Sequence, residues 1–526
     1  MKIAYLGYDI LIECLKMIRK QGHEIIKIFT VPSGDRYDLN DQILVFGADF
    51  SIPVVTERIS SEDMDQLLSE GCELLICAGY PYRIPVLTQI RAINIHPELL
   101  PRGRGSWPMP VTILRHFEQS GVTIHKLSEE FDAGDILSQV SYDIEERETL
   151  VTLTDKIQKT AVRMLQDCLG DFERIYQHAV PQASGKAEYW ADPSGQERIV
   201  TLQMSAEETD RRLRAFAGYG CLLQTETGAV PIDLVQYREI RISDMEEINR
   251  IRELYHNTFS AYTFPCIYCW KQLQNLSIYI EEDWFSVKCD GDEYYYPCGN
   301  PDKTEVFLKT MEYTQKSFRL GYIQKDEAAG LADRHPELDC TEDRDNFDYI
   351  VPMKQFAELE GKHYRTIRKE IHQFERSGVL ETEEINEENV HIVEQIAIEW
   401  SREAAGNSDY ADTIAEESAV RHYARLNMTG ILAKKDGVYF GFVMGTPIDG
   451  HTVDVHFAKC IDTSPGADFY CKQMFCRQFM DRYEFMNMEE DMGNEGIRTR
   501  KLLFRPTSLT EVCIAEYHKQ DGVQHG

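Results

Sequence analysis

The chain has 526 residues, of which 43% are hydrophobic and 27% are charged, and this composition is that of a globular protein with roughly three or four domains. Acidic residues outnumber basic ones by 88 to 56, and the net charge of −32 disfavours a broad nucleic-acid surface. No run is apolar and long enough to span a bilayer, and no signal peptide is recognisable, so we expect a cytoplasmic protein. The 14 cysteines are scattered through the chain, which predicts reduced thiols rather than a disulfide framework.

The first residues have the pattern of a parallel α/β sheet. Apolar runs at 2–6, 24–29 and 73–77 predict strands, and residues 10–20 between the first two predict an amphipathic helix. The turn at Gly7 is not followed by the glycine pattern of a dinucleotide-binding loop, so a nicotinamide cofactor is not expected.

Polar side chains that suit acyl transfer follow next. Residues 91–96 alternate between apolar and polar side chains, so Asn94 and His96 point the same way from one strand. A loop rich in proline and glycine covers the strand end, where ligands bind in α/β sheets. A helix at 108–119 and a second alternating run then lead to a turn that carries Asp132. An amide, an imidazole and a carboxylate together suit acyl transfer; a buried Asn–His pair that satisfies loop carbonyls is the alternative.

Several short motifs in this stretch occur in a fixed order. They are Asn94-x-His96-Pro97, Leu99-Leu100-Pro101, Arg104-Gly105, Gly121-Val122-Thr123 and Asp132-x-Gly134-Asp135-Ile136. Together they resemble the active-site pattern of the formyltransferases that use 10-formyltetrahydrofolate, a family with glycinamide ribonucleotide, methionyl-tRNA and amino-sugar formyltransferases among its members. The similarity runs from Met1 to about residue 236 and implies a Rossmann-like fold.

The resemblance also implies roles for individual residues. It places Asn94, His96 and Asp132 at the catalytic positions. It also implies that five residues lie beside the folate co-substrate: Tyr80, Tyr82, Ile84, Gly134 and Asp135. Ordinary loop packing is the alternative for the first three. Candidates for contact with the amine acceptor are Arg102, Arg104 and Trp107. We favour a small acceptor such as a nucleotide-linked amino sugar; methionyl-tRNA is the alternative, which the net charge disfavours.

The boundaries of the first domains follow from composition and helical spacing. A long helix at 151–177 would close a catalytic domain at 1–181. A helix at 204–216, capped by Ser205 and Glu208, would belong to a small subdomain at 182–238 that resembles that of methionyl-tRNA and sugar formyltransferases.

Four cysteines in the middle of the chain could supply zinc thiolates: Cys266, Cys269, Cys289 and Cys298. The residues between them resemble aromatic strands that turn at Asp290-Gly291, and the second pair lacks the C-x-x-C spacing of a zinc site. We therefore predict no metal site here.

The last third holds a second set of motifs: Asp343–Tyr349, Leu359–Arg365, Val455–Lys459 and Asn487–Gly493. They resemble a poorly characterised bacterial family related to the C-terminal domain of phosphatidylglycerol lysyltransferase. The resemblance implies tandem acetyltransferase-like (GNAT-like) α+β domains, which we place at 239–345 and 346–526. This half is then either an acyl or aminoacyl transferase or a silent binding module.

The charged residues near the end of the chain are candidates for a second site. We predict that one pocket is lined by Asn487, Glu489, Asp491, Arg498 and Lys501, with bracing of the last strand as the alternative. Acetyl-coenzyme A is doubtful as a donor, because Gly466 stands alone where acetyltransferases have several glycines before a helix. A basic stripe on a helix at 362–376 could hold a phosphate-bearing donor or be a solvated face. The oligomeric state is not defined by the sequence.

Overall fold

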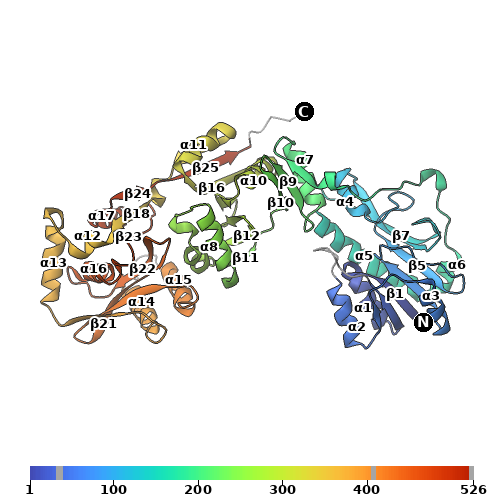
Figure 1. Ribbon diagram of the computed structural model, residues 1–526, viewed down its shortest axis with the longest axis horizontal. Coiled ribbons are helices and arrows are strands. Elements are labelled where there is room, and N and C mark those ends of the chain that lie inside the picture. The colour runs from blue at the N-terminus through green and yellow to red at the C-terminus, as the bar shows by residue number, and fades with distance from the viewer. Residues whose placement is uncertain (31–39, 404–409, 520–526) are drawn as a thin grey trace. The chain divides into compact units, whose positions relative to one another are not determined.

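The computed structural model describes residues 1–30, 40–403 and 410–519, and the chain divides into two compact units, Met1–Leu234 and Val235–Gly526 (Figure 1). Each unit has its own sheets and core. Across the described ranges, every helix is too short or too polar to cross a lipid bilayer.

A seven-stranded sheet forms the centre of the first unit. Its strand order is β3-β2-β1-β4-β5-β6-β7. The first five strands in that order run parallel: β3 (Val54–Val55), β2 (Glu24–Phe29), β1 (Lys2–Gly7), β4 (Leu74–Ala78) and β5 (Arg91–His96). The last two, β6 (Gln119–Lys126) and β7 (Ile136–Asp143), are antiparallel. The predicted Rossmann-like α/β fold is confirmed.

Helices pack on this sheet because one face of each is apolar. They are α1 (Ile12–Lys20), α2 (Asp41–Asp49), α3 (Ser61–Ser69), α4 (Pro108–Leu114), α5 (Leu150–Gly170) and α6 (Phe172–Gln177). The single helix predicted at 151–177 is wrong in one respect, because Asp171 leaves the helical conformation and separates α5 from α6. The helix predicted at 108–119 is also too long, because β6 begins at Gln119.

A small three-stranded sheet ends the first unit. It consists of β8 (Ile199–Thr201), β9 (Cys221–Thr225) and β10 (Gly228–Ile232), with α7 (Ala206–Ala215) beside it. Half of the predicted capping box is present, since the Ser205 side chain accepts a hydrogen bond from the Glu208 N–H, while the Glu208 side chain pairs with Arg212 instead. Arg214 donates to the backbone carbonyl of Glu148, at 2.9 Å, and so ties α7 to the loop before α5.

The first sheet of the second unit has eight strands. They are β11 (Arg238–Glu239), β12 (Ser277–Glu281), β13 (Trp284–Lys288), β14 (Glu293–Tyr295), β15 (Cys298–Gly299), β16 (Ser317–Gln324), β17 (Leu338–Glu342) and β25 (Val512–His518). The predicted hairpin at Asp290-Gly291 is formed by β13 and β14. The helices of this part are α8 (Met245–Leu254), α9 (Phe264–Trp270), α10 (Pro301–Thr314) and α11 (Lys325–Arg334).

The second sheet has the order β19-β20-β21-β22-β23-β18-β24. Its strands are β18 (Asp348–Pro352), β19 (Leu380–Glu384), β20 (Thr429–Lys435), β21 (Val438–Pro447), β22 (Thr452–Cys460), β23 (Phe485–Asn487) and β24 (Ser508–Thr510). Its helices are α12 (Met353–Glu358), α13 (Arg365–Glu375), α14 (His391–Glu403), α15 (Tyr410–Arg421), α16 (Ala467–Phe479) and α17 (Glu495–Leu503). Ile367, Ile371 and Phe374 of α13 are buried. The side chains of the predicted basic stripe, on α13 and just beyond its ends, are exposed: Lys362, Arg365, Lys369, His372 and Arg376.

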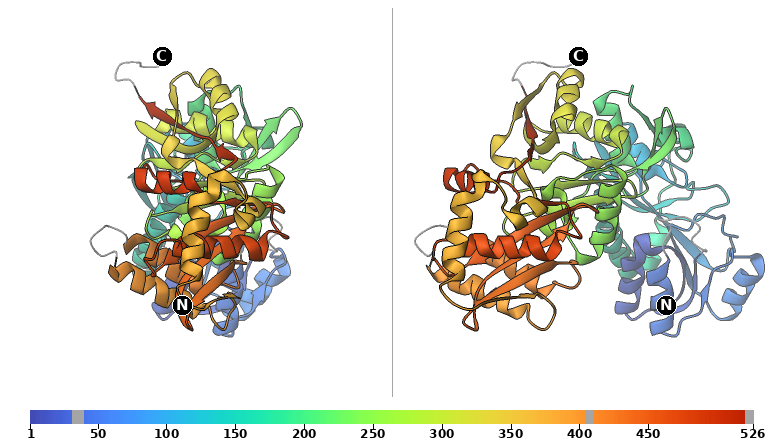
Figure 2. Two further views of the ribbon diagram at one scale, coloured as in Figure 1. Left: turned by 90° about the vertical axis from the view of Figure 1, so that its left-hand side faces the viewer. Right: turned by 60° about the vertical axis from the view of Figure 1, so that its left-hand side comes forward.

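The last strand of the chain returns to the first of these two sheets. Ala515 of β25 pairs with Leu320 of β16 on one side and with Cys340 of β17 on the other. Figure 2 shows the red arrow of β25 among the yellow strands of that sheet. The predicted domain 346–526 did not include this pairing of β25 with β16 and β17. Strands so far apart in the sequence pair because of tertiary packing, which the local sequence does not reveal. Phe285 and Phe442, one from each sheet, lie in one buried apolar cluster, so the two sheets share a core.

Candidate functional sites

The carboxyl end of β5 brings the three predicted catalytic residues together. Asn94 and His96 lie two positions apart on this strand, and Asp132 follows β6 on a turn. Asn94 Nδ2 donates to Asp132 Oδ1 at 3.1 Å, and His96 Nδ1 lies 3.6 Å from the same oxygen. One carboxylate oxygen is therefore in reach of both the amide and the imidazole.

A second histidine, which the sequence analysis did not single out, completes this cluster. Because β5 and β6 pair with Asn94 opposite His125, His125 Nε2 lies 3.1 Å from Asn94 Nδ2 and 3.5 Å from Asp132 Oδ1. His125 Nδ1 lies 2.8 Å from the carbonyl of Lys126, to which it can only donate. Its Nε2 is therefore free to accept from Asn94.

Asp132 is held by the backbone N–H of Gly105 and by the side chain of Gln182. The Gly105 N–H donates to Asp132 Oδ2 at 3.0 Å, and Gln182 donates to the carbonyls of Asp132 and Gly134. Asp132 has a φ of 53°, in the left-handed region that side chains rarely adopt. Gly134 is required here, because a Cβ atom would lie 1.9 Å from the Lys126 carbonyl oxygen. The turn therefore fixes the direction of the carboxylate.

The protonation states of this cluster follow from burial and neighbouring groups. Burial by itself would raise the pKa of Asp132, but His96, His125 and the Gly105 N–H bring it well below its usual range. Burial lowers the pKa of His96 below its usual value, although Asp132 acts in the opposite direction. His96 Nε2 donates to the Gly103 carbonyl at 2.8 Å, which leaves Nδ1 facing Asp132. Near neutral pH the site thus holds a carboxylate beside an uncharged imidazole.

A cavity of about 690 Å³ opens beside these residues. Asn94, His96 and Asp132 line it, and so do the predicted folate neighbours Tyr80, Tyr82 and Ile84 and the predicted acceptor residue Trp107. Four other predicted residues are not among its lining. Gly134 packs against Lys126, and Asp135 forms an ion pair with Lys126 at 3.2 Å. Arg102 pairs with Glu98 at 2.6 Å, and Arg104 donates to Gln182 at 2.7 Å.

Two other arginines do line the cavity. Arg83 donates to the Glu129 carbonyl at 2.6 Å, and Arg198 donates to the carbonyl of Tyr219 at 2.9 Å. The ring centroids of Trp107 and Tyr219 are 4.8 Å apart, so the small subdomain contributes to an aromatic wall. No local motif marks Arg198, because its place at the cavity depends on how the subdomain packs on the rest of the unit.

The second unit contains a cavity of about 700 Å³ between its two sheets. Of the five residues predicted to line one pocket, Glu489 and Lys501 do so. Asn487 instead donates to Asp348 at 2.8 Å, and Arg498 pairs with Asp491 at 2.8 Å and with Asp345 at 2.7 Å. These three side chains brace the loop after β23, as the alternative interpretation proposed.

Charged groups are crowded at the wall of this second cavity. Lys501 Nζ donates to the carbonyls of Met488 and Glu490. Burial lowers the pKa of Lys501 and raises the pKa of the Glu489 and Glu490 carboxyls. Titratable groups that are buried in a cleft and perturbed in this way are typical of functional sites.

Comparison with known proteins relates each unit to a family. Residues 13–169 match the family described as "Formyl transferase", and residues 252–515 match the family described as "Phosphatidylglycerol lysyltransferase, C-terminal". A methionyl-tRNA formyltransferase from Treponema denticola is 32% identical over 177 residues, 32% of this chain and 55% of that protein. This chain therefore spans about half the length of that relative. Another, from Anaplasma marginale, is 31% identical over 227 residues, 41% of this chain and 74% of that protein.

A solved structure also resembles the chain. It is a conserved protein of unknown function from Bacteroides thetaiotaomicron, with 24% identity and a TM-score of 0.50, and the match covers 54% of this chain and 100% of that one. This similarity concerns the fold alone.

The first unit has a mainly parallel sheet with an Asn–His–Asp cluster at a strand end. The second unit has two mixed sheets around a cavity. Together they have the architecture of two fused group-transfer folds. The chain belongs to the formyltransferase family through its first unit and to the phosphatidylglycerol lysyltransferase C-terminal family through its second. Both resemblances drawn from the sequence are confirmed.

Proposed function

We propose that the first unit transfers a formyl group from 10-formyltetrahydrofolate to the primary amine of a small molecule. The observation that carries the proposal is the convergence of Asn94, His96 and Asp132 on a cavity of about 690 Å³ at the end of β5. Membership in the formyltransferase family supports the donor. Tyr80, Tyr82 and Ile84 line the same cavity and would contact the folate.

The reaction joins the amine nitrogen to the formyl carbon and breaks the bond between that carbon and N10 of the folate. One amine proton must leave and one must reach N10. His96 is the better proton acceptor of the two candidates, because its imidazole is uncharged near neutral pH and the Asp132 carboxylate is a much weaker base. Asp132 then stabilises the imidazolium, since His96 Nδ1 lies 3.6 Å from its carboxylate. The protonated His96 returns the proton to the leaving N10.

Asn94 would stabilise the negative charge that develops on the formyl oxygen. Its Nδ2 contacts both His125 and Asp132, so donation to the oxyanion replaces one of these two hydrogen bonds. The His125 contact is the one to exchange, because Asp132 must keep its partners to remain ionised.

The acceptor that fits best is a nucleotide-linked amino sugar. Trp107 and Tyr219 offer a surface on which a nucleobase can stack, and Arg198 offers a cation for a phosphate. Arg102 and Arg104 do not line the cavity, so phosphate recognition would fall to Arg198 and Arg83. Methionyl-tRNA is the second candidate, because relatives of at least 30% identity bear that name, and the net charge of −32 works against it.

We further propose that the second unit is an acyl or aminoacyl transferase. Its cavity of about 700 Å³ is large enough for a small substrate, and it is lined by a thiol, carboxyl groups and amines, among them Cys266, Glu489 and Lys501. The family match supports transfer chemistry at this place.

One experiment tests the first proposal. The full chain is incubated with 10-formyltetrahydrofolate and, separately, with amino-sugar nucleotides, simple diamines and methionyl-tRNA, and each product is analysed by mass spectrometry. A formyl adduct on an amino-sugar nucleotide that His96→Ala fails to form supports the proposal. An adduct only on methionyl-tRNA would replace the proposed acceptor, and no adduct on any amine would refute the function.

A further inference from the structure

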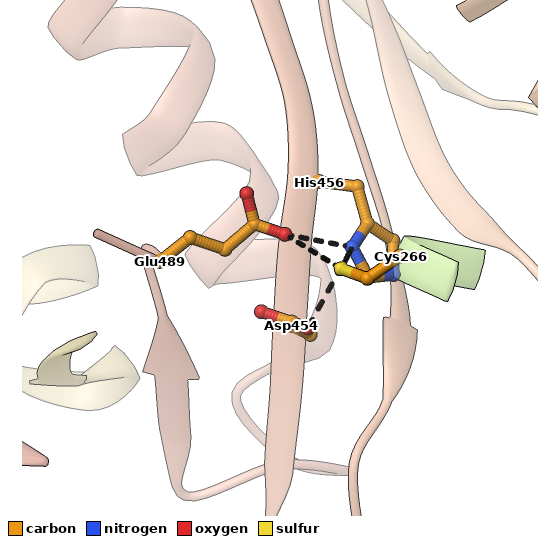
Figure 3. Close-up of side chains that lie close together, drawn as sticks. All are labelled: Cys266, Asp454, His456 and Glu489. Atoms are coloured by element: carbon orange, nitrogen blue, oxygen red, sulfur yellow. Dashed lines mark hydrogen bonds and ion pairs between the residues drawn. The ribbon is translucent and has the colours of Figure 1, made fainter. Parts of the chain in front are cut away.

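Four side chains of different chemistry meet at the wall of the second cavity. They are Cys266, Asp454, His456 and Glu489, and their ligand atoms all lie within 4.8 Å of one another (Figure 3). Asp454 and His456 point the same way because they are two positions apart on β22. Cys266 comes from α9, and Glu489 follows β23. Three separate elements thus direct donors to one point.

Three of the six distances between these donors fit a tetrahedral metal site. Cys266 Sγ lies 3.5 Å from His456 Nδ1 and 3.4 Å from Glu489 Oε1, and His456 Nδ1 lies 3.6 Å from Asp454 Oδ2. A tetrahedral zinc ion with bonds of about 2.0–2.3 Å separates its ligands by about 3.3–3.8 Å. A fourth contact, 2.9 Å between His456 Nδ1 and Glu489 Oε1, would have to open by about 0.5 Å, and the other two donor pairs lie within 4.8 Å.

Asp454 gives an independent indication of a cation. Its side chain is 0% exposed, and neither carboxylate oxygen has a hydrogen-bond partner. A buried carboxyl group without a partner is costly, whereas coordination to a metal would satisfy it. Arg252 is the nearby buried cation, yet the ion pairs of the described residues do not join it to Asp454. The recorded ion-pair partner of Asp454 is His456 Nδ1 at 3.6 Å, and a cation between the two would satisfy the carboxylate.

The second partner of His456 orients its ring as in known metal sites. His456 Nε2 lies 2.7 Å from the buried hydroxyl of Thr446, which leaves Nδ1 directed at the other three donors. Burial lowers the pKa of His456, and an uncharged imidazole is the form that binds metals. Burial also raises the pKa of Asp454, Glu489 and Cys266, so these acids cannot all ionise without a cation among them.

We propose that Cys266, Asp454, His456 and Glu489 bind one Zn²⁺ ion at the wall of the second cavity. A thiolate and an imidazole select zinc over magnesium or calcium, which prefer oxygen ligands. Cys266, His456 and Glu489 line the cavity and Asp454 does not, so the ion faces the cavity space. No metal site was predicted from the sequence because only cysteines were considered as ligands. Within the described ranges, the metal-binding groups that come together do not include Cys269, Cys289 or Cys298.

The test uses the full chain, purified without metal-affinity resin and stripped of metal by dialysis. Loaded with Co²⁺, the wild-type protein should bind about one equivalent and absorb in the near ultraviolet through a thiolate–cobalt band. Cys266→Ser should lose that band, and Asp454→Asn should weaken Co²⁺ binding at least tenfold. Cys460→Ser is the matched control, because Cys460 lines the same cavity outside the cluster and should keep the band.

Alkylation of the wild-type protein keeps the proposal testable if either variant fails to fold. Peptide mass spectrometry after iodoacetamide treatment should show Cys266 protected by one equivalent of Zn²⁺ and Cys460 unprotected. Equal rates of Cys266 alkylation with and without Zn²⁺ would overturn the proposal. So would a cobalt band that persists in folded Cys266→Ser.

Discussion

Asn94 and His125 face each other across the antiparallel pair of β5 and β6, with 3.1 Å between Asn94 Nδ2 and His125 Nε2. His125 Nδ1 donates to the Lys126 carbonyl, so the ring cannot turn away without losing a second hydrogen bond. His125 therefore orients the Asn94 amide before the substrates react, and the developing oxyanion then replaces this hydrogen bond. It acts through Asn94 and is a positioning residue in the proposed reaction.

Replacement of His125 tests this role. His125→Ala should lower kcat on the order of ten- to a hundredfold with little change in the KM for 10-formyltetrahydrofolate, because the amide loses its direction and the folate contacts remain. His125→Gln, which keeps a polar group at this position, should recover part of the rate. Steady-state kinetics decide the matter, and a change confined to KM would show that His125 only shapes the pocket.

The pH dependence of formyl transfer should report His96. Because burial holds the pKa of His96 below the usual value, the uncharged ring is present at neutral pH and is lost only as the pH falls through that lowered pKa. The rate should therefore be level around pH 7 and decline only below the usual histidine pKa of about 6.5. Asp132 stays ionised across this range, since its pKa is lower still. An acid limb with an apparent pKa above that of ordinary histidine would contradict the assignment of His96 as the proton acceptor.

Substitution of Trp107 tests the acceptor side of the first cavity. Trp107→Ala should raise the KM for a nucleotide-linked acceptor about tenfold, because stacking on an aromatic ring is worth roughly 1–3 kcal/mol per base. The KM for the folate should change little. Tyr189 is a suitable control, since it is 66% exposed and is not among the cavity-lining residues. Equal effects on the KM values of both substrates would place Trp107 at the folate instead.

Asp491 should matter for stability rather than for formyl transfer. Its buried carboxylate binds Arg498, Arg344 and the Tyr349 hydroxyl, so Asp491→Ala should destabilise the second unit by about 3 kcal/mol. Thermal unfolding should show a lower Tm for that unit and unchanged formyl transfer by the first. Asp345→Ala, which removes an exposed partner of Arg498, should have little effect. A Tm that falls equally in both variants would show that burial of Asp491 is not the cause.

The parts of the first site that the sequence predicted correctly depend on local geometry. Residues two apart on a strand point the same way, so Asn94 and His96 had to share one face of β5. The parts that the sequence did not predict depend on contacts between remote segments. His125 needs the β5–β6 register, and Arg198 needs the packing of the subdomain.

The second unit shows the same division. The β13–β14 hairpin follows from the local turn signal at Asp290-Gly291 and was predicted. The return of β25 to the first sheet and the meeting of Cys266 with His456, 190 residues apart, are set by long-range packing. Arg102 and Arg104 were predicted to face the acceptor, but the sequence does not reveal that Glu98 and Gln182 occupy them.

Single-turnover formylation measures the central claim most directly. The full chain is mixed with 10-formyltetrahydrofolate and an amino-sugar nucleotide, and the formyl adduct is followed for the wild type and for Asn94→Ala, His96→Ala and Asp132→Ala. We predict adduct formation by the wild type and a loss on the order of a hundredfold or more in each folded variant. A His96→Ala variant that forms the adduct at the wild-type rate would contradict the account.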